Sequence, residues 1–335
     1  MPLGIVFTAA YSAGMKEDRQ QTAGTAGAAL HPEHHARHPI GQGLLIALAG
    51  FAILSVGDAI VKSMAGQWPG PAIAALRYVY GVIALGSFIA LRHGRAGFVL
   101  PRPSLQLGRG AAVSVMTIGL FCGSQLMPLA DAISIQFTSP MFVVLLSPLV
   151  TGEHAPRSAW VTILLAFAGV LLVLRPNVAD LGVVAFLPVV ASMGMAMLVM
   201  FNRKTANLAP VVTLQFWLSV MAAPILIVAT CIGHLSGLKF LHVSVPQPIV
   251  LLKCAMVAVT GTTSHWMIYV ATQKASAPVI APMIYVQLLV AVSLGWMVFG
   301  DSIDPLSALG MALIILAGLL LWHFQRRPQP GHVKG

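Results

Sequence analysis

The sequence predicts an all-α membrane protein whose ten transmembrane helices form two inverted five-helix repeats, with both chain ends in the cytoplasm. Three observations predict this fold class. Hydrophobic residues make up 58% of the 335 residues and charged residues only 8%, whereas about a quarter of a soluble domain is charged. The apolar runs are long enough to cross a ~30 Å hydrocarbon core at about 1.5 Å per residue. A helical hairpin of the first half also recurs in the second.

In chain order, we expect helices at about 43–64, 70–91, 107–127, 130–150, 158–175, 179–201, 209–232, 247–272, 277–299 and 304–324. The connectors are short, and several carry Pro or Gly at helix ends, as in Trp68-Pro69-Gly70-Pro71. Residues 43–176 then form the first repeat and residues 177–324 the second. Residues 325–335 are expected to be a cytoplasmic C-terminal tail.

Residues 1–42 lack apolar periodicity and are rich in Ala, Gly, Gln and His, which is typical of a disordered cytoplasmic tail. The tail contains a histidine cluster from His31 to His38, which we interpret as solvated in preference to metal-binding. Whether translation starts at Met1 or at Met15 is left open. No metal site is predicted, because the three cysteines are scattered in expected helices with no paired spacing.

Basic residues indicate the orientation, since cytoplasmic loops of membrane proteins keep an excess of Lys and Arg. With the N-terminus inside, the inner segments carry Arg92, Arg95, Arg102, Arg109, Arg157, Arg203, Lys204, Lys274, Arg326, Arg327 and Lys334. The outer side and outer membrane half carry fewer, namely Lys62, Arg77, Arg175, Lys239 and Lys253. The net charge of +10 therefore reports topology, and nucleic-acid binding is not expected.

The repeated hairpin shows in matching motifs of the two halves. Gly152-Glu153 aligns with Gly300-Asp301, and the Pro-x-Ser-Ala motif from Pro156 aligns with the one from Pro305. Five helices per half give the second repeat the opposite orientation, and such inverted repeats build their substrate site between the halves near the midplane. This pattern favours a carrier. A channel and a membrane enzyme are the alternatives, but rings of charge and paired catalytic groups are not seen in the sequence.

The motif order is a small-residue helix, a Pro in the membrane, a Gly-acid turn and a Gly-x-Leu-Leu helix. With these motifs, residues 43–324 resemble the drug/metabolite transporter superfamily in its EamA-like branch of ten-helix carriers. The resemblance implies a transporter of the inner membrane, not an enzyme, that moves a small organic metabolite by alternating access. It favours export, with uptake of a vitamin or S-adenosylmethionine-like metabolite as the alternative.

The segment PLADAISIQFTSP, from Pro128 to Pro140, resembles a branch with carriers for riboflavin, S-adenosylmethionine and opine-type metallophores. The substrate candidates are therefore amino-acid-like, flavin- or nucleoside-like compounds, or an opine metallophore. No cofactor is expected, and the expected partners are the substrate and the lipid bilayer. The sequence does not predict the oligomeric state.

Asp58 is the acidic residue that lies clearly within an expected helix, and a carboxylate in hydrocarbon should face the bundle interior or water. Lys62 follows one turn later, and Arg77 lies near the start of the next helix. In one interpretation, Asp58 couples protons or binds a substrate amine, while Lys62 or Arg77 binds a substrate carboxylate. In the other, Asp58 and Lys62 form a structural ion pair.

Further candidates for the substrate or proton pathway are Gln136, Thr138, His265, Tyr285 and Gln287. Polar groups at depth turn inward and can hydrogen-bond a ligand, although helix packing is an alternative role for each. His265 can titrate near neutral pH and relay protons, or it can be an inter-helix hydrogen-bonding group.

Four residues are expected to shape the backbone. Pro140 and Pro282 should remove backbone hydrogen bonds inside the membrane. The turn acids Glu153 and Asp301 should place negative charge near the start of the following helix. We interpret these acids as structural, since the inverted topology puts them on opposite membrane faces.

Overall fold

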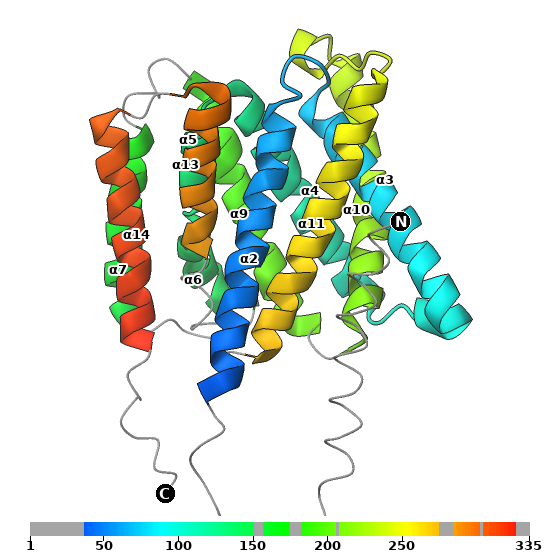
Figure 1. Ribbon diagram of the computed structural model, residues 1–335, viewed down its shortest axis with the longest axis horizontal. Helices are drawn as coiled ribbons and strands as arrows, with labels where there is room; N and C mark the ends of the chain where they lie inside the picture. The colour runs from blue at the N-terminus through cyan, green and yellow to red at the C-terminus, as the bar shows by residue number, and fades with distance from the viewer. Residues whose placement is uncertain are drawn as a thin grey trace, which may run out of the picture. The chain divides into compact units, whose positions relative to one another are not determined.

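The computed structural model describes residues 37–150, 157–174, 182–205, 208–274, 284–301 and 304–325 (Figure 1). The chain divides into two units, Met1–His38 and Pro39–Gly335, and the architecture below is that of the second. Within the described ranges, the regular structure is helical and contains no β-strand.

The first half contains α2 (Arg37–Lys62), α3 (Gly70–His93), α4 (Pro103–Leu126), α5 (Leu129–Gln136), α6 (Ser139–Val150) and α7 (Arg157–Leu174). The second half contains α9 (Phe186–Thr205), α10 (Val211–Leu235), α11 (Pro248–Lys274), α13 (Tyr285–Phe299) and α14 (Pro305–Gln325). Short 3-10 helices lie at Gly94–Phe98, Gly182–Ala185 and Lys239–Leu241. Most of these elements match the predicted helices to within a few residues.

Five helical segments of the described chain are long and apolar enough to cross a membrane, judged by length and composition. They are Gln42–Lys62, Gly70–Phe98, Pro103–Leu126, Gly182–Asn202 and Val211–Leu235. Large apolar side chains such as Leu164, Ile232 and Trp296 are exposed on the helices. Apolar surface on this scale is unfavourable in water and indicates contact with lipid.

The predicted single helix at 130–150 is wrong in one respect, because the structure contains two helices there. Helix α5 ends at Gln136, Phe137 and Thr138 form a turn, and α6 begins at Ser139. Pro140 therefore lies in the first turn of α6, where its missing N–H has no intrahelical partner to lose. The proline permits a helix start at this depth and does not interrupt a continuous helix.

The helices pack with small residues at their closest approaches. Helix α4 packs on α9, α3 on α10 and α7 on α14. A Cβ atom built at Gly194 of α9 would lie 2.6 Å from the backbone nitrogen of Met116 in α4, and one at Gly119 would lie 2.9 Å from the nitrogen of Ala191. Small residues let backbones approach in this way in membrane proteins, so α4 and α9 form a tight pair.

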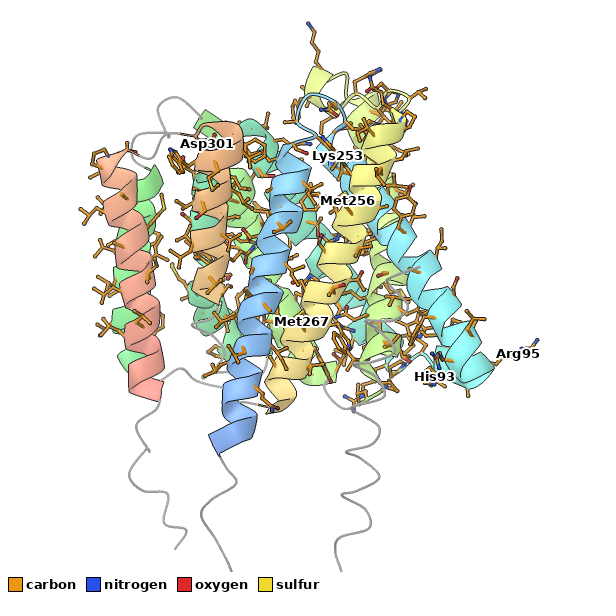
Figure 2. The ribbon with its side chains drawn as sticks, in the orientation of Figure 1. His93, Arg95, Lys253, Met256, Met267 and Asp301 are labelled. Atoms are coloured by element: carbon orange, nitrogen blue, oxygen red, sulfur yellow. The ribbon has the colours of Figure 1, made fainter. Side chains whose placement is uncertain are left out.

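The main buried cluster lies where α3, α4 and α5 meet α9, and it includes Ile73, Phe121, Leu129 and Ile133. Figure 2 shows His93 and Arg95 at one end of the helices, and Lys253 and Asp301 at the opposite end. The polar groups described next lie between these ends or close to the second of them.

Candidate functional site

A central cavity of about 490 Å³ lies between helices of both halves. Its polar lining consists of Asp58, Arg77, Thr117, Gln136, Ser139, His265 and Gln287. The end of α5 and the start of α6 contribute Gln136, Phe137 and Ser139, so the helix break lies against the cavity. Irregular backbone at membrane depth is tolerated at such places.

A polar contact between α2 and α13 forms one side of this cavity. The Nε2 atom of Gln287 donates a hydrogen bond to Oδ2 of Asp58 at 2.9 Å, and Ser55 Oγ donates to the Gln287 carbonyl oxygen at 3.0 Å. All three side chains are buried. Ser55 and Asp58 share a face of α2 because they are three residues apart. The contact orients the Asp58 carboxylate toward the cavity and joins the two halves.

Arg77 of α3 contributes a guanidinium group that is buried but not hydrogen-bonded. Its side chain is 7% exposed, and no acceptor or carboxylate binds it in the described ranges. Its Cζ atom lies 5.0 Å from the ring centre of Tyr78 and 5.7 Å from that of Phe121. These cation–π contacts stabilise the charge and leave its N–H donors unused.

Gly261 of α11 makes room for this guanidinium. A Cβ atom built there would lie 2.8 Å from both Cζ and Nε of Arg77, so any larger residue would displace the group. His265 follows one helical turn later, and its Nε2 atom is buried without a hydrogen-bond partner among the described residues. Buried polar atoms are normally satisfied, which makes the Nε2 atom of His265 unusual here.

A second, smaller cavity of about 320 Å³ lies between α3, α10 and α11. Its lining includes Gln215, Ser219 and Thr262, together with Arg77 and His265, which also line the central cavity. These two residues therefore form the wall that both cavities share.

Lys62 does not pair with Asp58, although the spacing along α2 allows it. Its ammonium group forms an ion pair with Asp301, just after α13, and lies 4.8 Å from the ring centre of Phe299. The pair joins the two halves at the end where Figure 2 labels Asp301. Asp301 therefore forms an ion pair with Lys62, in addition to the structural role in a turn that the sequence predicts for it.

The remaining predicted site residues have different placements. Thr138 Oγ1 lies 2.7 Å from Ser192 Oγ and 2.8 Å from the Ile135 carbonyl oxygen, so it ties the helix break to α9. Tyr285 begins α13, but its side chain lies outside the described set, as do Glu153 and Pro282. The same holds for the side chains of the His31–His38 cluster.

Arg109 is a buried residue whose position the sequence analysis missed, since it was counted among the cytoplasmic charges. It lies in α4 at 4% exposure. Its Nε donates to Asn202 at 2.7 Å, and Nη1 donates to Gln106 at 2.7 Å and to the Leu214 carbonyl at 3.1 Å. These bonds tie α4 to α9 and α10, so Arg109 has the structural role that Arg77 lacks.

The comparisons with known proteins relate the chain to membrane transporters. Residues 41–175 match the EamA-like transporter family. The S-adenosylmethionine uptake transporter of Rickettsia bellii is 21% identical over 276 residues, which cover 82% of this chain and 90% of the relative. The riboflavin transporter of Rhizobium johnstonii is 24% identical over 286 residues, covering 85% and 91%.

The pseudopaline exporter CntI of Pseudomonas aeruginosa is 25% identical over 290 residues, covering 84% of this chain and 95% of the relative. A protein of known crystal structure superposes with a TM-score of 0.61 at 18% identity, covering 86% of this chain and 99% of its own. The matched family and these named relatives are transporters. The match of residues 41–175 to the EamA-like family confirms the resemblance seen in the sequence.

Proposed function

We propose that the protein is a multi-pass carrier of the inner membrane that exports a small organic metabolite by alternating access. It has ten transmembrane helices in two inverted five-helix repeats, residues 43–176 and 177–324, and both chain ends are cytoplasmic. The relatives include an uptake transporter and an exporter, so uptake is the alternative direction. As part of the same proposal, the binding of protons at Asp58 drives transport.

The helix contacts support the inverted repeats. If the halves correspond, α3 matches α10, the α5–α6 pair matches α13, and α7 matches α14. Each of these corresponding pairs is in contact: α3 with α10, α5 with α13, and α7 with α14. A pseudo-two-fold axis brings corresponding elements together in this way. The ends marked by His93 and Arg95, and by Asp301 and Lys253, also fit the predicted cytoplasmic and outer sides.

The central cavity is the observation that supports the carrier best, because both halves line it and it contains the Asp58 carboxyl group and the Arg77 guanidinium without an ion pair between them. Asp58 and Arg77 both line it, and Asp58 is bonded to Gln287 and not to a cation. Unpaired buried charges are costly, and a zwitterion would neutralise both. An amino-acid-like metabolite therefore fits the cavity better than a neutral flavin, whose binding would leave both charges unmatched.

The Lys62–Asp301 pair supports alternating access. It joins α2 of the first half to the segment after α13 of the second, and lies at the predicted outer end. Opening that end requires the pair to separate, so the structure corresponds to a state that is closed there.

Metabolite profiling tests the function. Medium and cytosol of cells overexpressing the protein are compared with those of a deletion strain, and cells expressing Asp58→Asn serve as the site control. We expect a zwitterionic compound to accumulate in the medium on overexpression and in the cytosol of the deletion strain. Depletion from the medium would reverse the direction. The same compound exported equally by Asp58→Asn would remove Asp58 from the site.

A further inference from the structure

The wall between the two cavities consists of Arg77 and His265, and each of these side chains lines both cavities. The central cavity extends from them toward α4, α5 and α13. The smaller cavity extends toward α10 and is lined there by Gln215 and Ser219. A group bound to Arg77 from one side is therefore already next to the other cavity.

Both wall residues have unused hydrogen-bond donors or acceptors. A guanidinium carries five N–H donors, and Arg77 uses none of them within the part of the chain that the structure describes. The buried Nε2 of His265 is also without a partner there. Arg109 shows the opposite arrangement, since three of its contacts are hydrogen bonds. A bound anion would satisfy both wall residues, because it accepts from Arg77 and from a protonated Nε2.

The backbone of α11 sets this arrangement. Gly261 and His265 lie one turn apart, on the same face of the helix, and the missing side chain of Gly261 is what lets the guanidinium lie against α11. The position of the charge between the cavities therefore depends on this glycine.

We propose that Arg77 and His265 hold the carboxylate of the transported metabolite, and that the smaller cavity is a second substrate subsite. The carboxylate exchanges between the cavities without leaving the guanidinium, and Gln215, Ser219 and Thr262 contact the metabolite on the far side. This inference rests on the proposed carrier function and adds the route that the substrate takes between the two cavities. It makes the gap between α3, α10 and α11 part of the substrate route.

Thiol labelling of the full chain in proteoliposomes tests the subsite without a known substrate. The native residues Cys122, Cys231 and Cys254 are replaced, and a single cysteine is introduced as Ser139→Cys in the central cavity or Thr262→Cys in the smaller one. Two reagents with the same reactive group are compared, the anionic 2-sulfonatoethyl and the neutral 2-hydroxyethyl methanethiosulfonate. The ratio of their rates reports the local positive charge.

We expect Arg77→Met to slow the anionic reagent about tenfold at both cysteines, because a unit charge a few ångströms away in partly hydrated surroundings has an effect of that order. The neutral reagent should change less than twofold. Arg77→Lys should keep most of the anionic rate. Gly261→Ala, which keeps the charge but displaces it, should slow the anionic reagent at both positions.

His265 is tested with two variants in the same assay. His265→Leu should slow the anionic reagent, whereas His265→Gln, which keeps a side-chain donor, should not. An anionic rate at Thr262→Cys that is independent of Arg77, or no labelling of either cysteine by the neutral reagent, would overturn the proposal. Labelling does not require transport. A chain that labels as expected but moves no metabolite would contradict the carrier function and leave the anion site intact.

Discussion

The ion pair between Lys62 and Asp301 makes a quantitative prediction about access to the cavity. Neutralising Asp301→Asn leaves the Lys62 ammonium partly buried without its carboxylate. The closed arrangement then loses stability relative to one in which Lys62 is hydrated. We therefore expect Asp301→Asn and Lys62→Met each to shift the protein toward the state that is open at this end.

The size of the shift follows from the burial of the pair. The two side chains are 13% and 18% exposed, which lies between the surface and the buried case. Exposed pairs contribute less than about 1 kcal/mol, whereas breaking a buried pair costs about 3–5 kcal/mol. About 2 kcal/mol is the intermediate value, which corresponds to about a 30-fold change in the equilibrium.

The assay measures how fast a maleimide modifies Leu120→Cys, a central-cavity position, in a background without the native cysteines. We expect a rise of about 30-fold in each single variant and a return toward the original rate in the charge-swapped Lys62→Asp/Asp301→Lys protein. Lys253→Gln is the matched control, because its ammonium lies at the same end but donates to the Ser63 carbonyl oxygen at 3.3 Å and pairs with no carboxylate among the described residues. Unchanged rates in both single variants would refute the reasoning.

Three further predictions concern packing and the site. Gly194→Ala places a methyl group against backbone atoms of α4 and should destabilise the protein by about 1–3 kcal/mol, seen as a lower melting temperature in detergent. Arg109→Met removes three hydrogen bonds and should cost about 3 kcal/mol by the same measurement, with Arg109→Lys recovering part of the loss. Gln287→Leu removes the hydrogen bond to Asp58 and should weaken substrate affinity about tenfold in a vesicle transport assay, whereas Ser55→Ala, which leaves that bond in place, should not.

Apolar patterning was sufficient to predict most helices, because a bilayer imposes one length and one polarity on every span. Helix α3 is an example, since the prediction of 70–91 compares with Gly70–His93 in the structure. The break between α5 and α6 was missed for the same reason. Phe137 and Thr138 are no more polar than their neighbours, so the pattern does not distinguish a turn from a helix at this point.

The candidate site was predicted as a set of residues but not as a set of contacts. Asp58, Arg77, Gln136, His265 and Gln287 do line one cavity. The partner of Lys62 lies 239 residues away in the sequence, and local spacing favoured a nearer carboxylate. The difference between a satisfied and an unsatisfied arginine depends on acceptors from distant helices, which a single sequence does not place.

The pairing of α7 with α14 has a consequence for synthesis. The backbone of α7 approaches α14 so closely that a Cβ built at Gly169 would lie 2.7 Å from the Gly310 carbonyl oxygen. At about 5–20 residues per second, the ribosome needs roughly seven to thirty seconds to proceed from the start of one helix to the start of the other. During this interval, the face of α7 at Gly169 has no α14 to pack against. A nascent chain that stops before α14 therefore keeps this surface uncovered.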